Sequence, residues 1–201
     1  MNHSIQEVLG DTDIYLIDQI MKGRYEMKDL ILDAGCGHGR NLHWFLQNNI
    51  SIYGVDQDEM AISSLQSRHP LLAERFQQSA VEKLPFENQY FHHVISSAVL
   101  HFARNTQHFH HMIAEMVRVL QSGGSLFIRM TSDIGIEDKV RSVGDGVYDI
   151  PDGSRRFLLT RQLLTDTMEK YKLSFLEPLK TVNVNDVRCM STLMLIRSED
   201  A

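Results

Sequence analysis

The sequence predicts one α/β domain built around a mostly parallel β-sheet, and three observations support this fold class. Short apolar runs alternate with helical patterns along most of the 201 residues, which is typical of βαβ units. The run LILDA at 30–34 contains an acid and is followed by the glycine-rich segment GCGHG. The last two apolar runs, 174–182 and 188–197, are separated by the polar segment NVND, so we expect these strands to pair antiparallel.

The composition is that of an ordinary globular protein, with 43% hydrophobic and 23% charged residues. The net charge of -6 has the wrong sign for a protein that wraps nucleic acid, so no nucleic-acid partner is expected. Two cysteines, Cys36 and Cys189, are too few for a disulfide framework or a four-cysteine zinc site. We see no signal-peptide pattern and no run that could span a bilayer, and therefore expect a cytoplasmic protein without membrane attachment.

The first half of the chain reads as helices and strands in alternation. A cap helix from about residue 12 to residue 23 is expected because glycine commonly ends helices. Apolar residues at helical spacing predict a helix at 40–49, and acids in the first turn support a second at 57–68. Short apolar segments predict strands at 29–34, 50–56, 75–81 and 92–99.

The second half continues this alternation and contains one long interruption. Amphipathic spacing predicts helices at 109–120 and 161–172, and a strand at 125–131 follows a glycine pair. Between them, about residues 132–158 contain two Asp-Gly pairs, the second within a Pro-Asp-Gly turn, which predicts a β-hairpin insertion. So long a connection is typical of a lid or binding loop, although a solvated excursion or a dimer contact remains an alternative.

The glycines after the first strand predict a cradle for a nucleotide-type ligand. Gly35 permits the tight turn, and Gly37 and Gly39 let backbone and ligand approach each other. Free N–H groups at the start of the following helix would favour an anion. The dinucleotide fingerprint needs its third glycine three positions after the second, where this chain has Arg40. This spacing disfavours a nicotinamide cofactor.

An acid followed by alternating glycines resembles motif I of the class I S-adenosylmethionine-dependent methyltransferases. GVDQDEM, VEKLPFENQYF, SSAVLHF and MVRVLQSGGSLFI resemble the later segments of that family, in the same order, over roughly residues 31–131. The GRN ending of the turn is similar to that of small bacterial methyltransferases of the tellurite-resistance type. The resemblance implies one class I methyltransferase domain over residues 1–201. It also implies a three-layer Rossmann-like fold with a seven-stranded, mostly parallel sheet and an antiparallel last strand.

The resemblance also implies a set of contacts with S-adenosylmethionine. The implied cofactor-binding residues are Asp33, Gly35, Cys36, Gly37, Gly39, Arg40, Asn41, Asp56, Gln57, Ala80, Val81, Glu82 and Ser97. The first five would hold the methionine end, and Arg40 and Asn41 would begin the next helix and meet the cofactor carboxylate. Ser97 would offer its backbone near the cofactor amino group.

The remaining implied contacts concern the adenosine. Asp56 would bind the ribose hydroxyls, with Gln57 beside it. Val81 and Glu82 would flank adenine, where many family members carry an Asp at the position of Ala80. Many also carry an Asp at the position of His92. Without the acid at position 80, adenine must be held by backbone groups or by Glu82.

Methyl transfer depends mainly on holding two reactants in line, so the sequence carries little catalytic signature. His101, just after the fourth strand, is the candidate general base, and a histidine that only packs against Phe102 is the alternative. Arg155, Arg156 and Arg188 could clamp an anionic acceptor, but a solvated surface is the favoured interpretation for all three. Tyr15, Asp186 and Arg188 lie on segments that could reach the same edge.

The histidines do not predict a metal site. His108, His110 and His111 crowd one helix start, His92 and His93 lie in a strand, and His111 and Glu115 have metal-pair spacing. No closed ligand set appears, so a surface histidine cluster is the expected arrangement.

Together these observations predict an S-adenosylmethionine-dependent methyltransferase of EC class 2.1.1 that produces S-adenosylhomocysteine. Its acceptor would be an unidentified small molecule, and its assembly a monomer or homodimer. Two alternatives remain: a protein that binds S-adenosylmethionine without turnover, and an NAD-dependent oxidoreductase.

Overall fold

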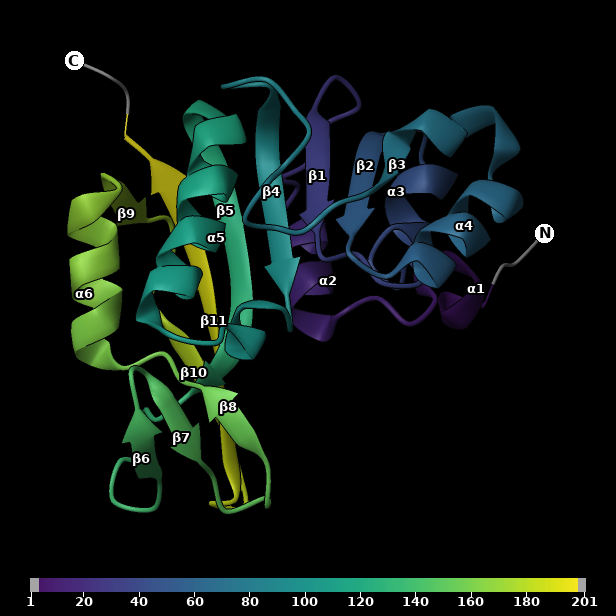
Figure 1. Ribbon diagram of the computed structural model, residues 1–201. Helices are drawn as coiled ribbons and strands as arrows, with labels where there is room; N and C mark the ends of the chain where they lie inside the picture. Colours follow the sequence, from purple (N-terminus) through teal and green to yellow (C-terminus); the bar gives the residue numbers. More distant parts are fainter. Residues whose placement is uncertain (1–3, 199–201) are drawn as a thin grey trace.

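A computed structural model describes residues 4–198, and its central feature is a mixed β-sheet (Figure 1). Its strands are β1 Leu30–Ala34, β2 Ser51–Asp56, β3 Phe76–Gln78, β4 Phe91–Ser97, β5 Leu120–Ser132, β9 Leu173–Phe175, β10 Lys180–Val184 and β11 Arg188–Arg197. They are ordered β10-β11-β5-β4-β1-β2-β3, and β9 also pairs with β11. Neighbours from β3 to β5 are parallel, whereas β11 is antiparallel to β5, β9 and β10. This topology confirms the predicted fold class, with the short strand β9 as an addition.

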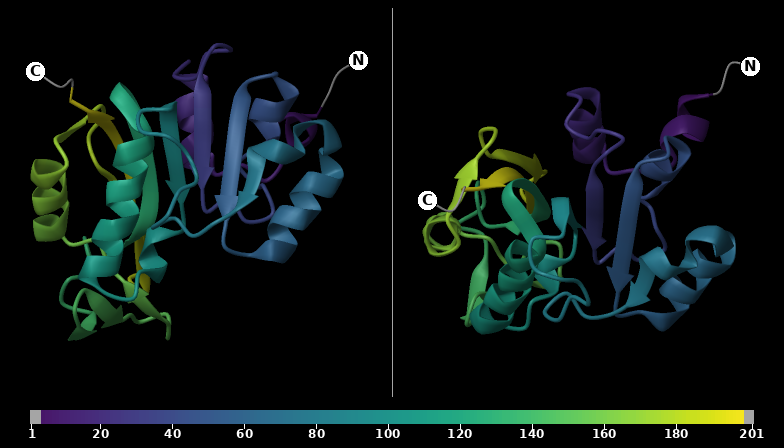
Figure 2. Two further views of the ribbon diagram at one scale, coloured as in Figure 1. Left: turned by 45° about the horizontal axis from the view of Figure 1, so that its top comes forward. Right: turned by 90° about the horizontal axis from the view of Figure 1, so that it is seen from above.

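The helices cover both faces of this sheet. They are α1 Ile5–Leu9, α2 Ile14–Met21, α3 His43–Gln47, α4 Glu59–Arg68, α5 Thr106–Val119 and α6 Arg161–Lys170, with short 3-10 turns η1 Pro70–Arg75 and η2 Leu100–Phe102. Side chains of α2, α3 and α4 share one buried cluster, and those of α5 and α6 share the other. Figure 2 shows α1 and α6 at opposite ends of the molecule.

The strands separate the two clusters because their side chains alternate between the faces. In β4, Val94 belongs to the α5 side and Ile95 to the α2 side. In β5, Leu126 and Phe127 divide in the same way, and all four side chains are almost fully buried. Burial on both faces explains why these strands appear as continuous apolar runs in the sequence.

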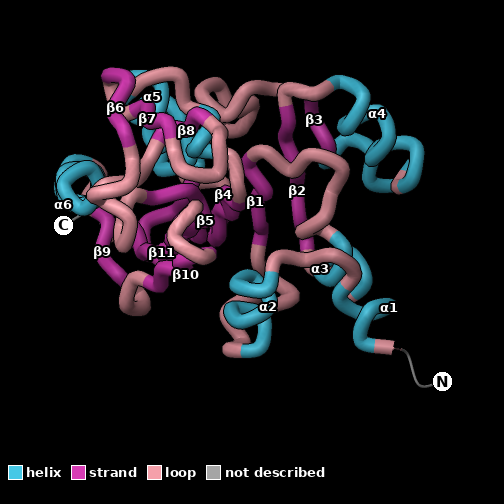
Figure 3. Tube along the Cα trace, turned by 90° about the horizontal axis from the view of Figure 1, so that it is seen from below, coloured by secondary structure: helices cyan, strands magenta, loops and turns pink. Residues whose placement is uncertain are grey.

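The predicted insertion contains three strands, β6 Arg141–Gly144, β7 Val147–Asp149 and β8 Arg155–Phe157, which form a second antiparallel sheet. Their turns coincide with the Asp-Gly and Pro-Asp-Gly segments of the sequence. Phe157 stacks on Phe109 of α5 with ring centroids 5.0 Å apart. The insertion therefore packs against α5 at the edge where β1, β2 and β4 end (Figures 1 and 3).

The cap helix α2 is held against the opposite end of the chain by a charged cluster. Lys22 pairs with Glu177 at 2.8 Å, Lys180 pairs with Asp18 at 2.7 Å, and Arg24 also pairs with Glu177. These contacts join α2 to the segment between β9 and β10. The other end of α2 is held separately, because the carboxylate of its N-cap Asp13 accepts hydrogen bonds from the Ser97 hydroxyl and from Arg129.

Candidate functional site

The glycine turn follows β1 at the carboxyl edge of the sheet. The N–H groups of Gly35 and Cys36 both donate to the carbonyl of Val55, at 2.8 and 2.9 Å. The turn is thus bonded to the end of β2 before the chain reaches α3. In open α/β sheets, ligands bind at this edge, where the strand order changes direction.

The three glycines are required for three different reasons. A Cβ at Gly35 would lie 2.4 Å from Val99, and a Cβ at Gly39 would lie 2.5 Å from Leu65. Around Gly37 no atom lies within 4 Å of the Cβ position. All three have positive φ, which glycine adopts at little cost. Gly37 alone of the three leaves open space for a ligand, whereas Gly35 and Gly39 allow close packing of the protein itself.

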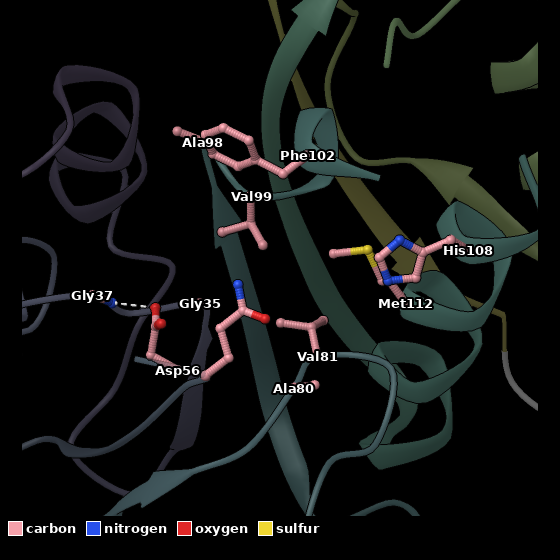
Figure 4. Close-up of a pocket in the computed structure, with 11 residues that line it drawn as sticks. Gly35, Gly37, Asp56, Ala80, Val81, Ala98, Val99, Phe102, His108 and Met112 are labelled. Carbon is pink, nitrogen blue, oxygen red and sulfur yellow. Dashed lines mark hydrogen bonds between the residues drawn. The ribbon is translucent and has the colours of Figure 1, made fainter. Parts of the chain in front are cut away.

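Asp56 at the end of β2 fastens the middle of the turn. One carboxylate oxygen accepts a hydrogen bond from the Gly37 N–H at 2.8 Å, and the other accepts from the Asp58 N–H at 2.9 Å (Figure 4). A carboxylate offers about four lone-pair positions, so these two bonds leave capacity for further donors. Asp56 can therefore hold the turn and accept hydrogen bonds from a ligand at the same time.

A cavity of about 340 Å³ opens beside Asp56. Its lining residues are Gly35, Gly37, Asp56, Gln57, Ala80, Val81, Ala98, Val99, Phe102, His108 and Met112 (Figure 4). The first six belong to the cofactor-binding set that the family resemblance implies, and they come from three separate segments of the chain. Asp33, Cys36, Gly39, Arg40, Asn41, Glu82 and Ser97 do not line the cavity, and their cofactor contacts stay predictions.

Five lining residues are absent from the implied cofactor-binding set. Three of them, Ala98, Val99 and Phe102, lie in the segment SSAVLHF after β4, and the other two lie on α5. Ala98 adopts a φ of 62° where the chain leaves β4, which turns Val99 toward the glycine turn. His108 and Met112 are four residues apart and therefore share a face of α5. That spacing is a usable signal. Amphipathic periodicity predicts Met112 on the buried face, which is confirmed, whereas it predicts His108 on the surface, which is wrong.

The expectation that His108 belongs to a surface histidine cluster is wrong, because only 12% of its side chain is exposed. Its Nδ1 accepts from the Arg104 N–H at 3.1 Å, so its proton resides on Nε2. Nε2 lies 3.0 Å from Glu82 Oε1, but the angle is not that of a hydrogen bond. Partial burial alone would raise the pKa of Glu82, but a backbone N–H, His108 and Arg104 together lower it. Glu82 is thus held toward α5.

Asp33 lies beneath the turn and is 1% exposed. Neither of its carboxylate oxygens has a hydrogen-bond partner among residues 4–198. Burial raises its pKa to about 7, the charge of Asp56 adds to the rise, and Arg40 opposes it. An unpartnered buried carboxylate is costly, so this position is suited to a cationic ligand group.

Arg40 and Asn41 do not begin the next helix, which is where the sequence prediction was wrong. α3 starts at His43, because the turn continues through two further residues. The Asn41 side chain accepts from the Asp13 N–H at 3.1 Å and is buried. Arg40 reaches toward Asp13 at 3.6 Å and donates to the Ser97 hydroxyl at 3.3 Å. Both residues join the glycine turn to the start of α2.

His101 lies in η2 and is 8% exposed. Its Nδ1 is buried and has no hydrogen-bond partner in the described chain. Burial lowers its pKa to about 4, with added repulsion from Arg156, Arg188 and Arg129. The ring is therefore neutral near pH 7, and its centroid lies 4.5 Å from that of Phe102, which lines the cavity.

The described residues contain neither a metal-binding cluster nor a membrane-spanning helix. Within residues 4–198, no group of three or more His, Cys, Asp or Glu side chains is arranged to hold a metal ion. Within the same part of the chain, every helix is too short or too polar to cross a bilayer.

Comparison with known proteins gives the site its context. Residues 32–128 match the family model described as a methyltransferase domain. The chain is 36% identical over 102 residues to a phthiotriol/phenolphthiotriol dimycocerosates methyltransferase of Mycobacterium leprae. Over about half of its length, the chain thus bears out its resemblance to the class I S-adenosylmethionine-dependent methyltransferases. That alignment covers 48% of this chain and 35% of the mycobacterial methyltransferase, so it concerns only about a third of the relative's length.

Solved methyltransferase structures share the fold over most of the chain. One from Methanosarcina mazei has a TM-score of 0.74 at 17% identity, covering 90% of this chain and 98% of that one. The 1,6-didemethyltoxoflavin-N1-methyltransferase of Burkholderia thailandensis has a TM-score of 0.67 at 18% identity, covering 92% and 76%. The latter was solved with bound 1,6-didemethyltoxoflavin and S-adenosylhomocysteine.

Proposed function

We propose that this methyltransferase domain transfers a methyl group from S-adenosylmethionine to a small-molecule acceptor. The observation that carries the proposal is the cavity in which Gly37, Asp56 and Val81 meet at the carboxyl edge of the sheet. Asp56 would bind the ribose, and the Ala80–Val81 backbone would contact adenine. The match to a methyltransferase family model over residues 32–128 supports this assignment.

The residues present fit such a cofactor at both ends. Gly37 leaves its backbone open toward the cavity, and Asp33 offers two unpartnered carboxylate oxygens beneath the same turn. An ammonium group such as that of a methionine moiety would satisfy Asp33 by charge and by hydrogen bonding. At the adenine end Ala80 supplies no carboxylate, so we assign recognition there to the backbone and to Glu82.

The cofactor supplies an electrophilic methyl group on a sulfonium. The chain itself supplies position and a dry environment, since Val99, Phe102 and Met112 present apolar surface to the cavity. His101 is neutral and can accept a proton, but its low pKa makes it a weak base. An acceptor that is already ionised, such as a thiolate, needs no stronger one.

Calorimetry with S-adenosylmethionine, S-adenosylhomocysteine and NAD tests the cofactor assignment. We expect binding of the first two and not of NAD, and binding of NAD alone would contradict the proposal. Release of S-adenosylhomocysteine in the presence of thiols, phenols, amines and oxyanions then tests transfer. Ala80 and the weak basicity of His101 are also compatible with a non-catalytic binder, which would bind the cofactor and release no product with any acceptor.

A further inference from the structure

A group of arginines lies beside the cavity at the carboxyl edge of the sheet. Arg129 comes from β5, Arg156 from β8 of the insertion, and Arg188 from the start of β11. All three add to the positive electrostatic field at His101. We call Arg129, Arg156 and Arg188 the arginine group. Segments far apart in the sequence thus place cations around one buried histidine.

The carboxylates near the arginine group do not balance it. Asp13 lies 3.1 Å from Arg129 but is shared with Arg40, and Asp152 lies 3.7 Å from Arg188. Arg156 has no carboxylate within ion-pair distance among residues 4–198. Its guanidinium lies over the Phe102 ring, 5.2 Å from the centroid, and donates to the Arg155 carbonyl. The edge of the cavity therefore carries excess positive charge.

His101 adds a second, independent sign of a ligand. More than nine-tenths of the residue is buried, and its Nδ1 lacks any hydrogen-bond partner in the described structure. A buried polar atom without a partner is costly unless a ligand or water satisfies it. Phe102, next in the chain, is 62% exposed, lines the cavity and carries Arg156 on its ring.

The adjacent arginine provides an internal contrast. Arg155 pairs with Asp149 at 2.8 Å on the insertion itself, whereas Arg156 is turned toward Phe102. Neighbouring strand residues point to opposite faces, so only Arg156 reaches Phe102, which lines the cavity. The expected solvated surface thus describes Arg155 but not Arg156.

We propose that the methyl acceptor is anionic, and that Arg156 and Arg188 bind its carboxylate, phosphate or sulfonate group beside His101 and Phe102. This inference rests on the proposed function, because it concerns the acceptor side of the same cavity. Guanidinium groups bind such oxyanions through charge-assisted, often paired hydrogen bonds. Arg129 already pairs with Asp13, and its guanidinium lies 5.2 Å from the centroid of the Tyr15 ring. It therefore contributes mainly to the positive electrostatic field at the site.

The test measures anion binding directly, by NMR of protein with labelled histidine side chains and bound S-adenosylhomocysteine. Sodium sulfate and sodium benzoate are titrated at constant ionic strength maintained with sodium chloride, and His101→Asn identifies the His101 resonance. We expect saturable shifts of that resonance and a rise in its pKa when an anion binds. Arg156→Gln and Arg188→Gln should each weaken binding by on the order of tenfold or more. Arg155→Gln is the matched control and should leave it unchanged.

Equal effects of sulfate, benzoate and chloride on His101 would overturn the proposal, and so would equal affinities of the Arg155 and Arg156 variants. Calorimetry with S-adenosylmethionine separates this result from the proposed function. Cofactor binding without specific anion binding refutes the anionic acceptor alone, whereas absence of cofactor binding refutes the methyltransferase assignment. The Arg156 and Arg188 variants should bind the cofactor with wild-type affinity.

Discussion

The Asp56 carboxylate accepts a hydrogen bond from the Gly37 N–H at 2.8 Å. The residue proposed to bind the ribose therefore also holds the glycine turn in place. Ligand affinity and turn geometry are coupled through this one side chain. Because this bond joins the turn after β1 to the end of β2, a substitution of Asp56 changes both the group that binds the ligand and the shape of the glycine turn.

Asp56→Ala should lower the affinity for S-adenosylmethionine by on the order of tenfold or more, because charge-assisted hydrogen bonds are lost. Isothermal titration calorimetry measures the change. Glu59→Gln, two residues after the Gln57 that lines the cavity, is the control and should bind normally. Unchanged affinity in the Asp56 variant would mean that the ribose lies elsewhere.

Gly37 and Gly39 should respond differently to alanine. Gly39→Ala should cost about 2–4 kcal/mol of unfolding free energy, because its Cβ would meet Leu65 at 2.5 Å in a strained backbone. Gly37→Ala should cost only about 1–2 kcal/mol of backbone strain but weaken cofactor binding. Urea unfolding and calorimetry measure the two quantities.

Gly23→Ala is a suitable control for the strain alone. Its φ of 67° is similar, and no atom lies within 4 Å of its Cβ position. It should therefore be destabilised like Gly37→Ala and bind the cofactor normally. If both variants bind equally well, Gly37 does not face the cofactor.

Asp33 should make stability depend on pH. Burial raises its pKa in the folded protein to about 7, above the ordinary value of 3.8. The folded state therefore retains the proton more strongly, and the associated stability is present below about pH 4 and lost as pH rises through 7. Asp33→Asn should remove a destabilisation on the order of a few kcal/mol at pH 8. Urea unfolding between pH 5 and pH 8 measures it.

The exposed residue Asp166 on α6 gives a matched control, since Asp166→Asn should keep the pH dependence of the wild type. Cofactor binding offers a second check, because a nearby ammonium would lower the Asp33 pKa and reduce the loss of stability at high pH. A wild-type pH profile equal to that of Asp33→Asn would be incompatible with a buried, unpartnered carboxylate.

Ala80→Asp should increase affinity for S-adenosylmethionine by several-fold, since a carboxylate there would accept a hydrogen bond from the adenine amino group. Ser79→Asp is the control, because Ser79 does not line the cavity. Calorimetry compares the two variants. Unchanged affinity in Ala80→Asp would place the adenine ring away from the Ala80–Val81 segment.

The positions of the strands along the chain were predictable because most are short apolar runs bounded by turn residues, and the antiparallel β10–β11 pair was predictable from its polar turn. The glycine turn was less so. Sequence alone does not distinguish Gly37, which faces open space, from Gly39, which faces Leu65 from α4. That difference arises from tertiary packing between segments that are distant in the chain.

The cation-rich side of the site was harder to predict for the same reason. Arg156 and Arg188 are separated in sequence from His101. The docking of the insertion on α5 brings Arg156 near it, and Arg188 arrives on β11, which pairs with β5. Periodicity alone predicts that His108, near the start of α5, lies on the exposed face of the helix. The loop that carries Glu82 covers it, and periodicity contains no information about that loop.

The insertion supplies Arg156, while the glycine turn and β2 supply the proposed cofactor contacts. Asp145 of the insertion accepts from the Thr106 N–H at 3.2 Å, and the Asp152 N–H donates to the Val187 carbonyl at 3.1 Å. These bonds anchor the insertion at two points outside the cofactor half. Substitutions within β6–β8 can therefore change which acceptor is preferred, while the residues proposed to bind the cofactor stay the same.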